Sequence, residues 1–282
     1  MNKQATPRQT WFITGASSGF GRAFASHALA QGHNVVATAR NTAMLADLAA
    51  SAPDRVLLQP LDVTVAGAAE KALAAALARF GRVDVLINNA GYGIVGALEE
   101  TPSAELRAVM ETNFFGAVAM TQAVLPQMRE QRSGAIVNIS SLGGQLSFGG
   151  FSAYSASKFA LEGMSEALAQ EVAPFGIKVL IVEPGAFRTA FAAEALKTMP
   201  AIAAYQDSIG GTRSMMQQMH GTQEGDPAKV PAAVEKALQA DTTPLRLQLG
   251  ADSVNYVRAH AETLLADLAT WEAVGLDTRV DQ

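Results

Sequence analysis

Short β-branched runs alternate with longer alanine-rich runs along most of this chain. The short runs indicate strands, because β-branched side chains suit a pleated and covered surface. The first five carry near-continuous apolar residues, which is typical of strands covered on both faces. The seven predicted strands are residues 10–14, 34–39, 55–59, 83–88, 134–140, 177–182 and 245–249.

The longer runs have helical periodicity, as in AAEKALAAALARF at 68–80. Parallel neighbouring strands need a long crossover connection, which is usually a helix. The alternation therefore predicts an α/β fold of the doubly wound Rossmann type, with a seven-stranded parallel sheet and helices on both faces. The predicted helices are residues 19–31, 42–51, 65–80, 102–130, 151–174, 227–240 and 251–271.

The strand rhythm runs unbroken to residue 182, and no repeat or flexible linker divides the chain, so we predict one domain over residues 1–282. The rhythm fails between Ala186 and about Pro231, where glycines and three methionines gather. Two interpretations stay open for this stretch: a substrate lid at about 186–231, or a surface helix pair packed by methionines. A further amphipathic helix is predicted at about 251–271.

Composition narrows the classes of function. Charged residues make up 17% of the 282 positions and the net charge is -5, so we expect no binding to nucleic acid or to a membrane surface. No apolar run reaches the roughly 18 residues that a membrane helix requires. The absence of cysteine excludes disulfides, and with no secretory signal it predicts a cytoplasmic protein. Four scattered histidines predict no metal site.

A glycine-rich turn follows the first predicted strand, with the spacing G-x-x-x-G-x-G. Glycines let backbone approach a pyrophosphate closely, and the N–H groups and dipole of the next helix favour its charge. Alone, the run also fits an ordinary glycine-rich turn, because the commonest dinucleotide pattern is G-x-G-x-x-G. In this position it predicts dinucleotide contacts from Gly15, Ser17, Ser18, Gly19, Phe20 and Gly21.

The second predicted strand ends at Arg40, where an NAD enzyme usually places an acidic residue for the ribose 2′-hydroxyl. A guanidinium can instead bind a 2′-phosphate through two hydrogen bonds. Ser17 and Asn41 lie where they can add further hydrogen bonds. Arg40 therefore predicts NADP(H) as the cofactor, against the alternative of a solvated arginine at a strand end.

Tyr154 and Lys158 lie four residues apart in a segment with helical periodicity, so both side chains share one helix face. A free phenol has a pKa of about 10, and a nearby ammonium, helped by an oxidised nicotinamide, is expected to lower it. This pairing predicts an acid/base tyrosine. Tyr-x-x-x-Lys also occurs by chance in helices, where the tyrosine merely packs and the lysine reaches solvent.

Other polar residues follow neighbouring strands. Ser140 and Ser141 end the fifth predicted strand, and Asn89 and Gly91 follow the fourth. Ligands of open α/β sheets bind outside the carboxyl ends of the strands, so these segments converge on one rim. Asn113 lies in the long helix that comes next.

These motifs, in this order, resemble the short-chain dehydrogenase/reductase family over residues 10–250. The resemblance implies that Tyr154 is the acid/base, that Ser141 orients the carbonyl, and that Lys158 binds the nicotinamide ribose. It implies that Asn113 positions a water behind Lys158. Cofactor contacts are implied for Asp62 and Val63 at the adenine, for Asn89 and Gly91 at the nicotinamide side, and for Pro184, Gly185 and Thr189.

The sequence thus predicts an NADP(H)-dependent oxidoreductase that interconverts a ketone or aldehyde and an alcohol, with a small apolar substrate. Two alternatives stay open: an NADP(H)-binding sensor or scaffold without turnover, and a reductase of 3-oxoacyl thioesters. The resemblance also implies a homodimer or homotetramer, assembled through the helices around 102–130 and 151–174. Ser155-Ala156-Ser157-Lys158 matches the S-x-x-K of penicillin-recognising enzymes, but the companion motifs of that class are missing.

Overall fold

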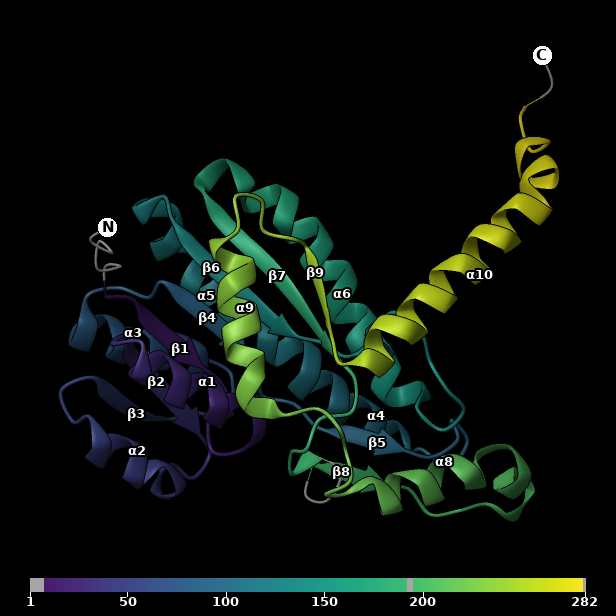
Figure 1. Cartoon of the computed structure of the whole chain (residues 1–282), viewed down its shortest axis with the longest axis horizontal. Coiled ribbons are helices and arrows are strands. Elements are labelled where there is room, and N and C mark those ends of the chain that lie inside the picture. Colours follow the sequence, from purple (N-terminus) through teal and green to yellow (C-terminus); the bar gives the residue numbers. More distant parts are fainter. Residues whose placement is uncertain (1–7, 192–194, 281–282) are drawn as a thin grey trace.

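Seven parallel strands form the central sheet of the computed structural model, which describes residues 8–191 and 195–280. Their order is β3-β2-β1-β4-β6-β7-β9. The chain starts in the middle of the sheet, builds outward to β3, and then returns to β4 on the other side of β1 (Figure 1). The strands are β1 (Thr10–Ile13), β2 (Asn34–Ala39), β3 (Val56–Pro60), β4 (Val85–Asn88), β6 (Gly134–Ile139), β7 (Ile177–Pro184) and β9 (Arg246–Leu249).

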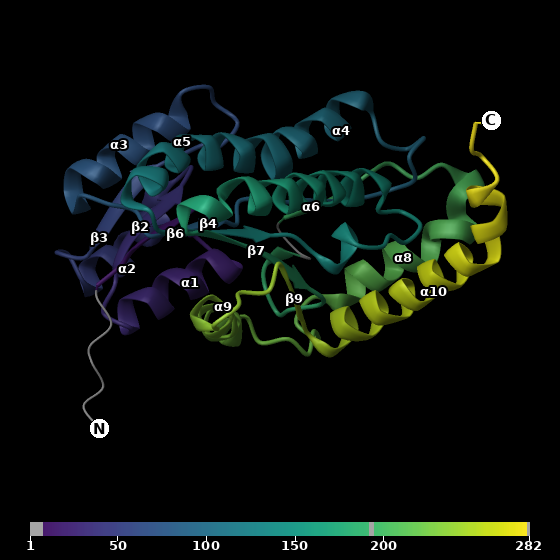
Figure 2. The same cartoon turned by 90° about the horizontal axis from the view of Figure 1, so that it is seen from above.

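Helices cover both faces of this sheet (Figure 2). The side chains of β1 show why, because neighbouring residues of a strand point to opposite faces. Trp11 and Ile13 are buried in the core beneath α1 and α9, whereas Phe12 is buried in the core beneath α3 and α5. One face carries α1 (Gly19–Ala30), α2 (Ala46–Ser51) and α9 (Val230–Gln239), and the other carries α3 (Ala68–Phe80), α4 (Ser103–Met110), α5 (Gly116–Gln131) and α6 (Ser152–Val172).

The predicted fold is confirmed, and every predicted strand ends within two residues of its expected limits. The long predicted helix at 102–130 differs in detail, because a π-helical turn at Glu111–Phe115 joins α4 to α5. A second, two-stranded sheet of β5 (Gly93–Val95) and β8 (Leu196–Thr198) was not predicted. Each of its strands has only three residues, which is too short to show a sequence period.

The segment predicted as a lid contains β8, a 3-10 turn at Ala203–Tyr205 and helix α8 (Gln206–Met219). Residues 192–194 of that segment lie outside the described residues, as does the N-terminal 1–7. Met216 of α8 is buried and Met215 is exposed, so one of the clustered methionines serves as core packing. Gly210 lies inside the helix, where it is buried as well.

The last helix, α10, spans Ala251–Leu276 and is longer than the sequence predicted. It leaves the body of the molecule at its first turn and extends outward (Figure 1). Only Ser253 of this helix is buried. Among the described residues, no helix combines the length and the apolar character needed to cross a membrane.

Candidate active site

The glycine-rich turn joins β1 to α1, at the place where the strand order reverses between β1 and β4. Gly15 and Gly19 adopt the left-handed φ values of 64° and 52°, which favour glycine. At Gly21 an added Cβ would lie 2.3 Å from the Gly15 carbonyl oxygen. These three glycines therefore form a tight cradle at a helix N-terminus, a geometry that fits the pyrophosphate of a dinucleotide.

Thr14 and Asn89 fasten this turn to the end of β4. The Thr14 hydroxyl oxygen accepts hydrogen bonds from the Asn89 and Ala90 N–H groups, each at 2.9 Å. The Asn89 amide in turn donates to the carbonyl oxygens of Thr14 and Gly15, at 2.9 and 3.0 Å. The predicted convergence of these two segments is therefore observed, and Asn89 serves as a brace for the turn.

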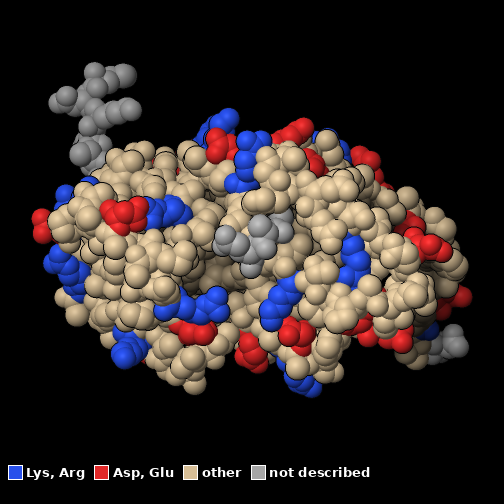
Figure 3. Space-filling model, turned by 90° about the horizontal axis from the view of Figure 1, so that it is seen from below, with Lys and Arg blue, Asp and Glu red and all other residues tan. Residues whose placement is uncertain are grey.

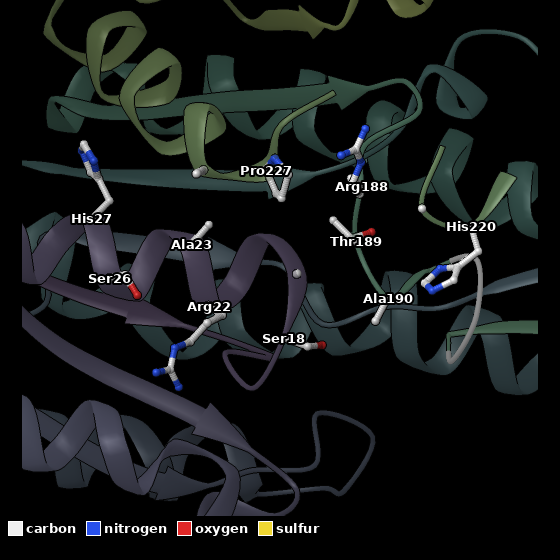
Figure 4. A pocket seen from close by; sticks show the side chains of 13 residues that line it. Ser18, Arg22, Ala23, Ser26, His27, Arg188, Thr189, Ala190, His220 and Pro227 are labelled. Carbon is white, nitrogen blue, oxygen red and sulfur yellow. The ribbon is translucent and has the colours of Figure 1, made fainter. Parts of the chain in front are cut away.

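Thr189 lies against the same helix N-terminus, within 3.5 Å of the position that a Gly19 Cβ would take. A cavity of about 760 Å³ opens beside them, lined by Ser18 and Arg22 of the α1 end and by Arg188 and Thr189 opposite (Figure 4). Phe20 stacks edge-on against Phe187, with ring centroids 5.2 Å apart.

The face seen in Figure 3 is hollowed near its centre, and lysines and arginines are mixed there with acidic residues. Tyr154 and Ser141 lie outside the lining of the cavity beside α1. Of the predicted cofactor contacts, Ser18, Gly19 and Thr189 line this cavity, which continues along α1 as far as His27.

The predicted adenine end gathers Arg40, Asp62 and Val63. Arg40 is exposed just after β2. Hydrogen bonds from Thr64 lower the pKa of Asp62, and the charge of Arg40 adds a smaller effect in the same direction. Val63 packs on Gly116 of α5, where an added Cβ would lie 2.5 Å from a Val63 methyl group. Asn41 caps the next 3-10 turn, accepting a hydrogen bond from Ala43 N–H at 3.1 Å.

Tyr154 and Ser141 are brought together by α6 and by the turn after β6. Their side chains lie close together, since Ser141 Oγ and Tyr154 Cε1 are 3.4 and 3.5 Å from the position that a Gly143 Cβ would take, and Ser141 Oγ accepts the Gly143 N–H at 3.0 Å. The neighbouring Ser140 instead lies beside the carboxylate of Glu162. The geometry thus distinguishes between the two adjacent serines.

Burial raises the pKa of Tyr154 to about 12, and the nearby Ser141 hydroxyl opposes this only in part. The predicted lowering of this pKa applies to a tyrosine beside both Lys158 and an oxidised nicotinamide, so it stays a prediction. Lys158 Nζ lies 5.8 Å from the centre of the tyrosine ring and donates to the Ile139 carbonyl at 2.9 Å. Burial lowers the pKa of Lys158 itself to about 8.

Asn113 lies in the π-helical turn, a form that recurs at functional sites. Its amide oxygen accepts the Tyr92 N–H at 3.0 Å, and its amide nitrogen donates to the Tyr92 carbonyl and to Ser157 Oγ. A Cβ on Gly91 would lie 3.0 Å from Asn113 Oδ1 and 3.7 Å from Lys158 Nζ. These residues therefore meet behind Tyr154.

A family model described as short chain dehydrogenase matches residues 9–200, which is more than half of the 282 residues. The chain belongs to this family. Oxidoreductase BOA17 of Botryotinia fuckeliana is 40% identical over 267 residues, covering 94% of this chain and 97% of the relative. A 3-ketodihydrosphingosine reductase of Bacteroides thetaiotaomicron is 49% identical over 183 residues, covering 65% of each.

A crystal structure of a short-chain dehydrogenase from Streptomyces avermitilis is similar over nearly the whole chain. Its sequence is 53% identical and the TM-score is 0.93. The match covers 97% of this chain and 100% of that one. Two further structures are each 25% identical: a Burkholderia phymatum short chain dehydrogenase/reductase in complex with NAD (TM-score 0.81, covering 92% of this chain and 95% of that one) and ElxO with NADP bound (TM-score 0.72, covering 88% and 99%). The family thus binds nicotinamide cofactors of both kinds.

This short-chain dehydrogenase has a buried polar cluster behind Ser140 that the sequence did not reveal. The carboxylates of Glu162 and Glu183 are 3% and 0% exposed. Gln145 donates to both at 3.1 Å, and Arg246 lies 3.0 Å from Glu162 and 3.5 Å from Glu183. Burial raises the pKa of both carboxyls, that of Glu183 to about 7. Only tertiary packing brings these distant residues together, so no local pattern could have signalled them.

Glu183 should make stability depend on pH. An unfolded glutamate loses its proton near 4.5, whereas the folded chain holds it to about 7, so the folded state binds more protons between these values. Unfolding free energy should therefore fall as pH rises from about 5 to 7, by up to about 3 kcal/mol. Glu183→Gln should flatten this fall in urea unfolding measured at each pH. Glu130→Gln, an exposed control, should leave it unchanged, and equal slopes for parent and Glu183→Gln would contradict the assignment.

The contacts of the first turn of α10 were also not predicted. Asp252 accepts the Ala186 N–H at 2.6 Å, and Ser253 Oγ donates to the Glu183 carbonyl at 2.7 Å. Gly185 is required at this contact, because an added Cβ would lie 2.0 Å from Asp252 Oδ1. The predicted contact residues Pro184 and Gly185 are therefore held in place by the C-terminal helix of this short-chain dehydrogenase.

Proposed function

We propose that this chain is an NADP(H)-dependent oxidoreductase that interconverts a ketone or aldehyde and the corresponding alcohol. The observation that carries the proposal is the closeness of the Tyr154 and Ser141 side chains beside Gly143, with Lys158 Nζ 5.8 Å from the centre of the tyrosine ring. These groups lie at the carboxyl ends of the strands, the side of the sheet on which the glycine cradle follows β1. An acid, an orienting hydroxyl and a cation beside a dinucleotide cradle fit carbonyl reduction.

Each residue has a separate role in the proposed mechanism. Gly143 N–H occupies one lone pair of Ser141 Oγ, so the serine proton is free to point at the substrate oxygen. Tyr154 gives its proton to that oxygen during reduction and takes it back during oxidation. The Lys158 ammonium stabilises the phenolate that remains. When the cofactor is bound, its nicotinamide carries the hydride.

The residues behind the tyrosine hold this arrangement in place. Asn113 fixes Tyr92 and Ser157, and through Tyr92 it shapes the wall at Gly91. We propose that it also positions a water between itself and Lys158. Lys158 would bind the nicotinamide ribose from its place beside the Ile139 carbonyl.

Arg40 supports NADP(H) over NAD(H). Its exposed guanidinium follows β2 and lies near Asp62, at the end of the site where the 2′-phosphate would lie. A guanidinium matches a phosphate through paired, charge-assisted hydrogen bonds. Since structures of related proteins contain NAD or NADP, the choice in this chain rests on this residue.

The surroundings of Tyr154 favour an apolar substrate. The rings of Phe151 and Phe191 lie 6.3 and 5.8 Å from the tyrosine ring. Thr212 of α8 donates to the Gly149 carbonyl at 3.0 Å, so α8 lies beside the turn that precedes α6. We propose that the 186–231 segment acts as a substrate lid. The likeness to a 3-ketodihydrosphingosine reductase supports a carbonyl on a long apolar chain.

The test is the oxidation of NADPH, followed at 340 nm, with a panel of ketones, aldehydes and 3-oxoacyl thioesters. We expect turnover with apolar ketones or aldehydes. Turnover confined to the thioesters would identify the acyl-thioester reductase instead. Tight NADPH binding without oxidation across the panel would favour a cofactor-binding sensor or scaffold.

We expect this protein to act as a homodimer or homotetramer through the helices α4 to α6. Phe115, beside α5, and Phe159 of α6 support this, because they are 49% and 45% exposed on the outer face of the body. Large aromatic side chains are enriched in protein interfaces.

A further inference from the structure

We propose that helix α10 pairs with the α10 helix of a second copy of this chain, in antiparallel orientation. Every described residue from 261 to 280 is exposed. Within this stretch Leu264, Leu265, Leu268 and Trp271 are 55%, 66%, 66% and 65% exposed. Most of the stability of a helix in a protein comes from packing its apolar face against other elements. The outer part of α10 therefore lacks the packing that a helix of its kind needs.

The apolar residues of α10 follow a heptad. Val254, Val257, Ala261, Leu264, Leu268 and Trp271 are separated by steps of three and four residues. This is the a/d spacing of a two-helix seam, in which side chains of one helix fit between those of another. The seam starts where the helix contacts the body and continues past the body edge (Figure 1). A helix of the same kind is therefore the partner that fits it.

The charges beside the seam specify the orientation. Arg258, Leu265 and Glu272 occupy the e positions, which face one another in an antiparallel pair. With Leu265 opposite its own copy, Arg258 of each helix lies opposite Glu272 of the other. In a parallel pair, Asp267 at position g would instead lie against Glu272, with like charges in contact. The sequence of α10 thus complements itself in one orientation.

The same charges argue against a membrane surface. Helices that lie on anionic lipid carry lysine and arginine on their polar face. The polar positions of α10 carry Asp252, Glu262, Asp267 and Glu272 against Arg258. An anionic surface would therefore repel this helix.

The first experiment measures association of the full chain by sedimentation equilibrium, over about 1–100 µM because a single helix pair is a small interface. We expect L264E/L268E to weaken the α10 step at least about 100-fold, since it buries charge in the seam. A266E/A273E introduces the same charges on the opposite face of the helix and should leave association unchanged. An unchanged association constant for L264E/L268E would overturn the proposal, as would a parent chain that binds anionic vesicles through α10.

Trp271 gives a second measurement that other interfaces do not affect. The chain has two tryptophans, and Trp11 is buried with 1% exposed. Acrylamide should quench the parent fluorescence weakly at high concentration and strongly on dilution or in L264E/L268E. Quenching that is equally strong in all samples would show that no second helix covers Trp271.

The orientation is tested by charge exchange. R258E and E272R should each weaken association about tenfold, because the two-fold symmetry repeats each lost pair. The double variant R258E/E272R should restore it to within about threefold of the parent. Failure to restore, or strengthening by D267K, would overturn the antiparallel pairing.

Discussion

Replacing Tyr154 by phenylalanine should lower kcat for ketone reduction by about 10³-fold or more, in the range that a lost general acid costs. The phenylalanine ring keeps the packing against Phe151 and Phe191, so the fold and NADPH binding should be unaffected. Only the phenolic proton donor beside Ser141 is removed. Steady-state kinetics with NADPH, together with NADPH titration by fluorescence, measure both quantities.

Tyr256→Phe is the matched control. Tyr256 lies on α10, and the centre of its ring is 5.4 Å from that of Phe148. Its hydroxyl has no part in the proposed mechanism, so kcat should stay within about twofold of the parent value. Full activity of Tyr154→Phe on a ketone that the parent reduces would disprove the acid/base assignment. Loss of NADPH binding in that variant would instead show that Tyr154 acts chiefly in holding the cofactor.

Replacing Arg40 by aspartate should reverse the cofactor preference, changing the ratio of kcat/KM for NADPH to that for NADH by at least about 100-fold. The substitution removes the paired hydrogen bonds to a 2′-phosphate and places a like charge beside it. It also provides an acceptor for the free 2′-hydroxyl of NADH. Initial rates at varied concentrations of each cofactor give the ratio.

Arg129→Asp makes the same change of charge near the end of α5, where the side chain is exposed. It should leave the ratio of kcat/KM for NADPH to that for NADH unchanged, because the end of α5 lies at the amino ends of the strands, away from the predicted cofactor site. A preference that stays the same in Arg40→Asp would remove the argument for NADP(H) and leave the choice to other residues.

The sequence predicted those parts of the site whose shape depends on residues that are close together in the chain. A glycine run between a strand and a helix has one compact shape, and the spacing of Tyr154 and Lys158 places both on one face of α6. The side-chain contacts of Glu162, Glu183 and Asp252 depend instead on residues that are distant in the chain. The raised pKa of Tyr154 has the same origin, since burial by tertiary packing outweighs the effect of the nearby Ser141 hydroxyl.

The π-helical turn and the small β5–β8 sheet were missed for a second reason. One extra residue in a helical turn leaves the apolar period almost unchanged, so the helix at 102–130 reads as continuous. The turn nonetheless brings Asn113 to Tyr92 and Ser157. Ser141 was assigned from the resemblance to the family, and in the structure it is Ser141 whose side chain lies close to that of Tyr154.

The first turn of α10 attaches this long helix to the body of the molecule. Asp252 and Ser253 clasp the backbone on both sides of Pro184, just before the segment that carries Thr189 to the end of α1. A helix of 26 residues is about 39 Å long, so its distal end lies far from the two contacts that attach it. A tilt of the distal end would therefore act on the backbone from Glu183 to Ala186, just before the segment that carries Thr189.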